Sequence, residues 1–255
     1  MSLLVKAGEP LPEDALEYVG FETRSRSFGG ETAERELCLV LLGGRCDVRS
    51  DHGEWTGVGG RESPFEGLPH AVYLPPGTAF EVDGSAEVAL CWAPASEGVE
   101  ARLIEPGDVG VTTRGSGAME RTIHNILMED APAESLLVTE VLTPDGHWSS
   151  YPPHKHDRDA PPDETFLEET YYHRIRPDHG FGLQRVYTAD GSLDESVAFR
   201  DGDVVLVPRG YHTVSAPPGY ELYYLNVMAG PRREWRMQND PEHEWLLSSR
   251  TSTTS

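Results

Sequence analysis

Short apolar runs recur along the whole chain, and turn signals such as GG, PPG, DG and PRG separate them. Their lengths and their content of β-branched and aromatic residues are typical of strands. No convincing amphipathic pattern continues beyond two helical turns. Many short strands at near-regular spacing predict an all-β protein built as a sandwich or barrel. The predicted strands are 37–42, 71–75, 80–82, 87–93, 135–143, 169–175, 181–188, 204–208 and 221–229.

The two halves of the sequence resemble each other. Each contains an apolar strand that ends in Pro-x-Gly, AVYLPPG at 71–77 and VVLVPRG at 204–210, and each has a glutamate (Glu36 and Glu169) opening an apolar strand upstream. We therefore expect an internal duplication with its junction in the Gly-rich TTRGSGAME segment. The predicted division is an N-terminal domain over 1–115, a C-terminal domain over 116–247 and a disordered tail over 248–255.

Charge and cysteine content exclude several classes of protein. The 255 residues include 21 Lys+Arg and 43 Asp+Glu, a net charge of −22, which excludes nucleic-acid binding through phosphates and disfavours docking on anionic lipid. No apolar run approaches a membrane span, and the N-terminal run is too short for a signal peptide. Cys38 and Cys91 lie in apolar strands and are expected as core residues of a reducing, cytoplasmic compartment.

The strongest chemical signal is the pair His154 and His156, because residues i and i+2 of a strand point to the same side. His212 follows the PRG turn, and a glutamate pair lies between them in sequence. Three imidazoles and one carboxylate suit zinc, manganese or iron. The competing interpretation is two surface histidines in a Pro-rich loop.

The choice of carboxylate follows from strand alternation. Glu169, Tyr171 and His173 would share the histidine-facing side of their strand, so Glu169 is the preferred ligand and Glu168 is the alternative.

These residues resemble the motifs of a duplicated cupin, a double-stranded β-helix barrel. The second cupin motif is matched by Gly202, Pro208-Arg209-Gly210 and His212, although His212 comes one residue early. The first motif is interrupted by an insertion between His156 and Glu169. In the N-terminal half, Glu36 and the PPG turn fit the motifs, but the histidines are missing, so we expect a metal-free barrel that supports the other.

The resemblance narrows further. Segments such as GLPHAVYLPPGT, RTIHNIL, SSYPPHKHDRD and PPGYELYYLNVMAGP are similar to the 5-deoxy-glucuronate isomerase family of inositol catabolism, which is related to the zinc-bearing 5-keto-4-deoxyuronate isomerases. This resemblance implies conversion of 5-deoxy-D-glucuronate to 5-dehydro-2-deoxy-D-gluconate, a divalent metal, most simply zinc, and no nicotinamide or flavin. The implied metal ligands are His154, His156, Glu169 and His212.

The reaction needs a base for a carbon-bound proton and a cation for the substrate carboxylate. Candidates for the base are Glu168, Glu169, His173 and Tyr224. Arg185 is the preferred partner for the carboxylate. Arg121 is a further candidate, although Arg121 and His124 precede the expected second barrel and could instead form the joint between the barrels. The remaining predicted substrate contacts are Tyr171 and Asn226.

Two other functions share this ligand set or this fold. A cupin dioxygenase would use Fe(II) at the same residues, and a non-enzymatic sugar-binding bicupin would use the barrel alone. The His-x-His, Glu and His set disfavours the second, because a storage barrel has no use for a metal site. Exposed sheet edges need cover, so a homo-oligomer is expected.

Overall fold

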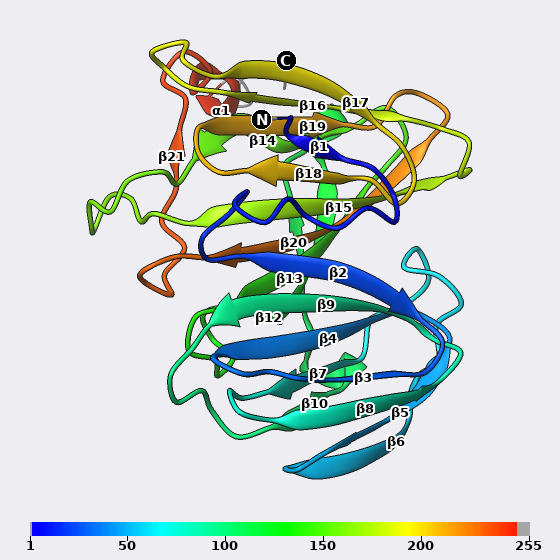
Figure 1. The fold of residues 1–255 in the computed structure, drawn as a ribbon. Coiled ribbons are helices and arrows are strands. Elements are labelled where there is room, and N and C mark those ends of the chain that lie inside the picture. The colour runs from blue at the N-terminus through cyan, green and yellow to red at the C-terminus, as the bar shows by residue number, and fades with distance from the viewer. Residues whose placement is uncertain (1, 249–255) are drawn as a thin grey trace.

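The computed structural model describes residues 2–248, and these residues are built almost entirely of β-strands (Figure 1). The strands form four antiparallel sheets, two in each of two barrels that are stacked one above the other in the view. Within the described residues, the α-helical part is limited to α1 (Trp245–Ser248), and two 3-10 turns span Pro106–Asp108 and Gly117–Met119. All nine predicted runs are strands, which confirms the all-β expectation.

The N-terminal barrel packs a five-stranded sheet, ordered β10-β7-β4-β9-β2, against a four-stranded sheet, ordered β3-β8-β5-β6. Its interior is filled by apolar side chains, among them Leu37, Leu39, Val72 and Trp92. The strands of this barrel are β2 (Gly20–Ser25), β3 (Phe28–Glu31), β4 (Arg35–Gly43), β5 (Arg45–Ser50), β6 (Gly53–Gly59), β7 (Ala71–Leu74), β8 (Ala79–Gly84), β9 (Glu87–Pro94) and β10 (Arg102–Ile104).

The C-terminal barrel packs a seven-stranded sheet, ordered β1-β18-β15-β20-β13-β12-β11, against a five-stranded sheet, ordered β17-β16-β19-β14-β21. Polar and aromatic side chains replace much of the aliphatic filling in its interior. Its strands are β1 (Leu4–Val5), β11 (Gly110–Arg114), β12 (Arg121–Leu127), β13 (Leu137–Thr143), β14 (Trp148–Lys155), β15 (Glu168–Arg176), β16 (Gly182–Tyr187), β17 (Asp194–Phe199), β18 (Val204–Val207), β19 (Tyr211–Ser215), β20 (Glu221–Ala229) and β21 (Gln238–Asn239).

The strand order corrects the domain boundary expected at residue 115. β1 pairs with β18 and β11 pairs with β12, so both belong to the sheet of the C-terminal barrel. The chain therefore starts on the second barrel, crosses to the first and returns before residue 110. β1 has two residues and β11 is exposed throughout, so neither has an apolar pattern that would reveal its partner. The expected tail lies, from residue 249 onward, outside the described residues.

The larger sheet of the N-terminal barrel faces the larger sheet of the C-terminal barrel, and the principal apolar cluster of the molecule is buried between them. Cys38, Val40 and Tyr73 contribute from the first barrel, and Val138 and Tyr223 from the second. Fully burying an aliphatic side chain of this kind stabilises the fold by roughly 1.5–3 kcal/mol. Apart from its exposed edge strand β11, the seven-stranded sheet consequently has one face toward its own barrel interior and one toward the N-terminal barrel.

Buried carboxylates bind backbone amides across this joint. Glu36 of β4 accepts hydrogen bonds from the N–H groups of residues 134–136, and Glu168 of β15 accepts them from Glu17 and Tyr18. The register shows that these two glutamates are equivalent: Leu37 pairs with Leu74 just before one Pro-x-Gly turn, as Glu169 pairs with Val207 before the other. The sequence-based match of Glu36 with Glu169 was therefore off by one residue, which exchanges the two faces of a strand.

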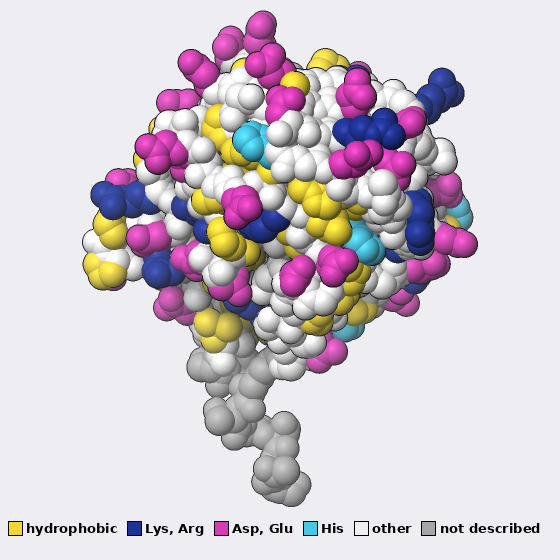
Figure 2. Space-filling model, turned by 90° about the horizontal axis from the view of Figure 1, so that it is seen from below, with side chains coloured by type: hydrophobic (Ala, Val, Ile, Leu, Met, Phe, Trp, Pro, Cys, Tyr) yellow, Lys and Arg dark blue, Asp and Glu magenta, His cyan; other side chains and the backbone are white. Residues whose placement is uncertain are grey.

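Charged side chains are dispersed over the surface. On the face shown in Figure 2, Asp and Glu are spread among Lys and Arg and form no single large patch. Among the described residues, no helix combines the length and the apolar character needed to cross a bilayer. All three cysteines, Cys38, Cys46 and Cys91, are buried and unpaired.

The joint predicts a pH-dependent contribution to stability. Burial acts to raise the pKa of Glu134, but hydrogen bonds from the N–H groups of residues 96–98 outweigh it and lower that pKa to about 2. Because the folded pKa lies below the unfolded value of about 4.3, this stabilisation is present near neutrality and is lost as the pH falls from about 5 toward 2. Glu134→Gln should lower the melting temperature at pH 7, and its difference from the wild type should shrink in acid.

Thermal unfolding followed by circular dichroism between pH 7 and pH 3 measures this difference. Glu13→Gln, at an exposed position elsewhere, is the control. A constant difference between wild type and Glu134→Gln at all pH values would contradict the assignment.

Candidate metal centre

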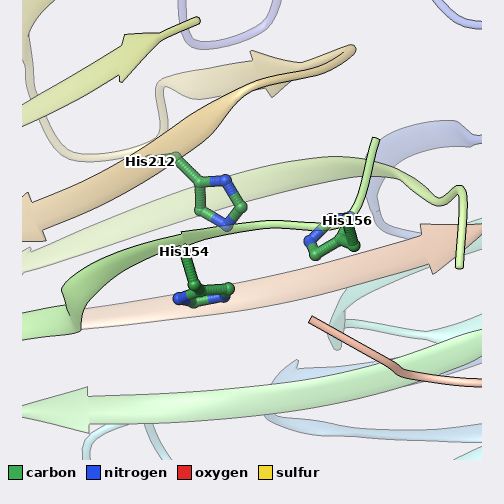
Figure 3. A group of neighbouring side chains, drawn as sticks. All are labelled: His154, His156 and His212. Atoms are coloured by element: carbon green, nitrogen blue, oxygen red, sulfur yellow. The ribbon is translucent and has the colours of Figure 1, made fainter. Parts of the chain in front are cut away.

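Two neighbouring strands bring the three histidines together. His154 of β14 and His212 of β19 are direct partners in the register, and His156 follows two residues after His154. Their ligand nitrogens all lie within 4.8 Å of one another, and all three side chains are buried. Figure 3 shows the three rings gathered around a shared space inside the barrel. The alternative of two surface histidines in a loop is therefore wrong.

Hydrogen bonds to the backbone orient two of the rings. His156 Nδ1 lies 2.9 Å from the carbonyl oxygen of Leu167, and His212 Nδ1 lies 3.1 Å from that of Gly210. Donation from Nδ1–H leaves the lone pair of each Nε2 directed at the shared space, as in protein metal sites. The Nε2 atom of His212 is buried and makes no hydrogen bond, although Glu169 Oε2 lies 3.1 Å away.

Glu169 completes the cluster. Its Oε2 atom lies 3.2 Å from His156 Nε2 and 3.1 Å from His212 Nε2. Burial acts to raise the pKa of this carboxyl, but its contacts with the two histidines lower it to about 2, so it is an anion at neutral pH. Glu168, the alternative ligand, points to the opposite face of β15 and binds backbone amides at the joint between the barrels.

The donor set fits a divalent ion. Burial, followed by the neighbouring imidazoles, holds the pKa of His154 well below its usual range, so its ring is neutral and can donate a lone pair. Neutral imidazoles with one carboxylate suit borderline ions such as zinc, manganese and iron. The direct structural sign is that His212 Nε2 lies 3.1 Å from Glu169 Oε2 without forming a hydrogen bond, because a buried polar atom that makes no hydrogen bond is costly unless a ligand satisfies it.

An ionic network around Lys155 holds the strand segment that carries His154 and His156. Lys155, between the two histidines, binds Glu164 through both carboxylate oxygens at 2.7 and 2.9 Å and Asp157 at 2.6 Å. Asp157 also accepts a hydrogen bond from the N–H of Gly210, two residues before His212. The network therefore ties the His-x-His strand to the turn that presents the third histidine.

A cavity of about 470 Å³ opens beside the cluster and is lined in part by His154 and Glu169. Four further predicted residues also line it: Tyr171, Tyr224, Asn226 and Arg121. The hydroxyl of Tyr171 is bonded to Ser150, and that of Tyr224 to Ser149. Burial acts first to raise the pKa of both phenols, so they are protonated hydrogen-bond donors at neutral pH.

Two guanidinium groups line the same cavity. Arg121 is largely buried, and its Nη1 donates only to the carbonyl oxygens of Met119 and Tyr151, at 3.0 and 3.4 Å. Arg114 lies over the ring of Trp235, with its Cζ 5.1 Å from the ring centre. Among residues 2–248, neither guanidinium forms an ion pair with an acidic side chain. Arg121 is on β12, inside the second barrel. Arg114 was missed because it precedes the expected domain boundary.

Two predicted site residues lie elsewhere. Arg185, the preferred carboxylate partner, is on the exposed outer face of β16, where it forms a bidentate ion pair with Asp194 at 2.8 and 2.9 Å. His173 is fully buried deeper in the barrel, hydrogen-bonded to Gln184 at 2.9 Å and stacked on Phe199 at 3.6 Å between ring centres. Neither lines the cavity, because strand alternation and barrel depth direct them away from it.

The fold and the cluster define a class of protein: a pair of tandem cupin barrels with a His₃Glu centre in the second. Comparison with known proteins is more specific. The sequence matches the KduI/IolB family over residues 12–246. Proteins named 5-deoxy-glucuronate isomerase from Geobacillus thermodenitrificans (strain NG80-2) and Bacillus subtilis (strain 168) are 55% and 47% identical to it; the alignments cover 94% and 91% of this chain and 90% and 89% of those proteins.

Solved structures agree with this result. An IolB-like protein from Salmonella typhimurium LT2 has 45% sequence identity and a TM-score of 0.93, and the match covers 97% of this chain and 100% of that chain. The oxalate decarboxylase of Lactobacillus farciminis shares the fold alone, at 11% identity and a TM-score of 0.62, over 92% of this chain and 82% of its own. The chain therefore belongs to the KduI/IolB family, and it is an isomerase.

The cluster predicts a specific effect on metal binding. Replacing His212 by Ala removes one of the three clustered imidazole donors, and we expect the affinity for Co²⁺ to fall at least about 100-fold. Titration of metal-stripped protein with Co²⁺, followed by the visible absorption of the ion, measures this affinity. His147→Ala is the matched control, because the ring of His147 is partly exposed, lies outside the cluster and bonds the carbonyl oxygen of Glu120. Equal affinities in both variants would contradict the assignment.

Proposed function

We propose that the protein is a metal-dependent aldose–ketose isomerase that converts 5-deoxy-D-glucuronate to 5-dehydro-2-deoxy-D-gluconate in inositol breakdown. One observation carries this proposal: a His₃Glu centre and two guanidinium groups without acidic partners open on the same cavity. The names of the relatives supply the particular sugar acid. A substrate with a carbonyl at one end and a carboxylate at the other matches this separation of charge.

Arg121 is proposed to bind the substrate carboxylate. Its guanidinium is held in place by two backbone carbonyls, which leaves further N–H groups for an anion. Arg114 adds a second positive charge at the same cavity. Glu169 is the only carboxylate that lines the cavity in the described part of the chain, so an anionic substrate meets little local repulsion.

A divalent ion bound by His154, His156, Glu169 and His212 would polarise the carbonyl and stabilise the enediolate that forms from it. The protein's own contribution to proton transfer is assigned to Tyr224. Its hydroxyl is protonated at neutral pH, lines the cavity and is backed by Ser149, so it can donate to a substrate oxygen as negative charge develops. The carbon-bound proton also needs an acceptor: of the candidates for this base, Glu168 and His173 lie outside the cavity, whereas Glu169 lines it and is an anion.

Proton NMR of metal-loaded protein with 5-deoxy-D-glucuronate in D₂O tests the reaction. We expect loss of the aldehyde signal and appearance of the ketose, with deuterium at the former aldehyde carbon if the transferred proton exchanges with solvent. Consumption of dissolved oxygen with formation of oxidised products would instead indicate a dioxygenase. Failure of the metal-loaded protein to convert 5-deoxy-D-glucuronate would contradict the proposed substrate assignment.

The proposal also distinguishes two arginines. Arg121→Ala should raise KM by about 10- to 100-fold, because it removes a charge-assisted hydrogen bond to the substrate carboxylate. Arg185→Ala should leave KM and kcat unchanged, because Arg185 is exposed and bound to Asp194 on the outside of the barrel. Steady-state kinetics of both variants measures this. The opposite ranking would restore Arg185 as the carboxylate partner.

A further inference from the structure

The wall of the cavity is also the joint between the barrels. Strands β12, β13 and β20 lie side by side in the seven-stranded sheet, and each has one face on the cavity. The cavity side is lined from these strands by Arg121, Ile123, Asn125, Thr139, Val141, Tyr224, Asn226 and Met228. The opposite face of the same strands packs against the N-terminal barrel. Any movement of these strands relative to that barrel therefore moves the cavity wall.

One side chain from the N-terminal barrel binds a carboxylate that links all three strands. Arg61 follows β6, and its guanidinium binds Glu140 of β13 through two hydrogen bonds, at 2.8 and 2.9 Å. The carboxylate of Glu140 also accepts from His124 Nδ1 of β12 at 2.8 Å and from the hydroxyl of Tyr223 of β20 at 2.9 Å. Arg61 is itself held by the carbonyl oxygen of Leu41 at 3.0 Å.

Each residue of this cluster that lies on β12, β13 or β20 is adjacent in sequence to a residue that lines the cavity. His124 lies between Ile123 and Asn125, and Glu140 lies between Thr139 and Val141. Tyr223 precedes Tyr224. The two central side chains are almost inaccessible to solvent, at 4% exposure for Arg61 and 0% for Glu140. A bidentate pair in such an environment fixes both distance and orientation.

We propose that Arg61 is a positioning residue for the isomerase reaction and that the N-terminal barrel acts through it. Arg61 and Glu140 form a clamp that holds β12, β13 and β20 at the spacing that places Arg121 and Tyr224 around the substrate. This inference rests on the proposed function for its kinetic readout. The metal ligands come from β14, β15, β19 and the residue after β14, so the clamp does not touch the strands that carry the histidines.

The test must separate the clamp from the cost of a buried, unpaired charge. Removing Arg61 alone would strand the carboxylate of Glu140, which destabilises proteins in general. The informative variant is therefore the double replacement Arg61→Met and Glu140→Gln, which leaves no buried charge behind. Glu87→Gln is the matched control: it removes another ion pair between the barrels, to Arg174, which remains paired with Asp201, and none of these three residues lines the cavity.

For the double variant we expect KM for 5-deoxy-D-glucuronate to rise about tenfold, because small displacements of binding groups are costly. The affinity for Co²⁺ should stay within about twofold of the wild type, because the strands that carry the histidines are not clamped. Glu87→Gln should match the wild type in both measurements. An unchanged KM with only a lower melting temperature would overturn the proposal, as would a parallel loss of Co²⁺ affinity.

Hydrogen–deuterium exchange gives a readout that needs no substrate. In the double variant, amides of β12 and β13 should exchange faster, while those of β14 and β19 should keep the wild-type rate. If the wild type fails to turn over the sugar acid, the proposed function fails, and this exchange pattern alone then decides on the clamp. An equal change in exchange rate, relative to the wild type, in both pairs of strands would overturn the clamp.

Discussion

The two-residue alternation of β-strands is the constraint on which the rest of this molecule depends. Along β15, Glu169 and Tyr171 face the barrel interior, while Glu168 and Tyr172 face the other barrel. One strand therefore supplies a metal ligand on one side and a structural anchor on the other. A shift of one residue would bury the anchor in the site and place the ligand in the joint.

The same constraint explains why two barrels with similar strand patterns differ in the chemistry of their interiors. At the position of Glu169 the N-terminal barrel has Leu37, and its interior is aliphatic. Its glutamate, Glu36, occupies the anchor position and binds backbone amides across the joint. The joint thus keeps a carboxylate in both copies, whereas only the second copy has donors that converge inside the barrel. The N-terminal barrel is best understood as a support for one wall of the cavity.

Local and global electrostatics act in opposite directions here. The net charge of −22 repels an anion at long range, but salt screens this repulsion over about 8–10 Å. Within the cavity, Arg114 and Arg121 are the cations and Glu169 is bound to histidines. On the face shown in Figure 2 the acidic side chains are dispersed over the outside, where they favour solubility.

Sequence patterns predicted local features well and spatial neighbours less well. The nine apolar runs are strands, and the spacing of His154, His156 and His212 was enough to group them. Arg185 was preferred over Arg121 because the segment of Arg121 precedes the first strand predicted for the second barrel, whereas the pairing of β12 with β13 places it in that barrel's sheet. The partner of Lys155, Glu164, lies in the insertion between the motifs, where no periodicity exists. The Arg61–Glu140 contact spans both domains and leaves no local signal.

The central claim is that isomerisation depends on one divalent ion held by the His₃Glu cluster. The most direct measurement is the rate of sugar-acid isomerisation while metal-stripped protein is titrated with Zn²⁺, with Mn²⁺ and Fe²⁺ in parallel. We expect negligible activity without metal and, with at least one of these ions, a rise that ends at one ion per chain. Full activity of the metal-stripped protein, or activity that does not change when any of these ions is added, would contradict the dependence on metal.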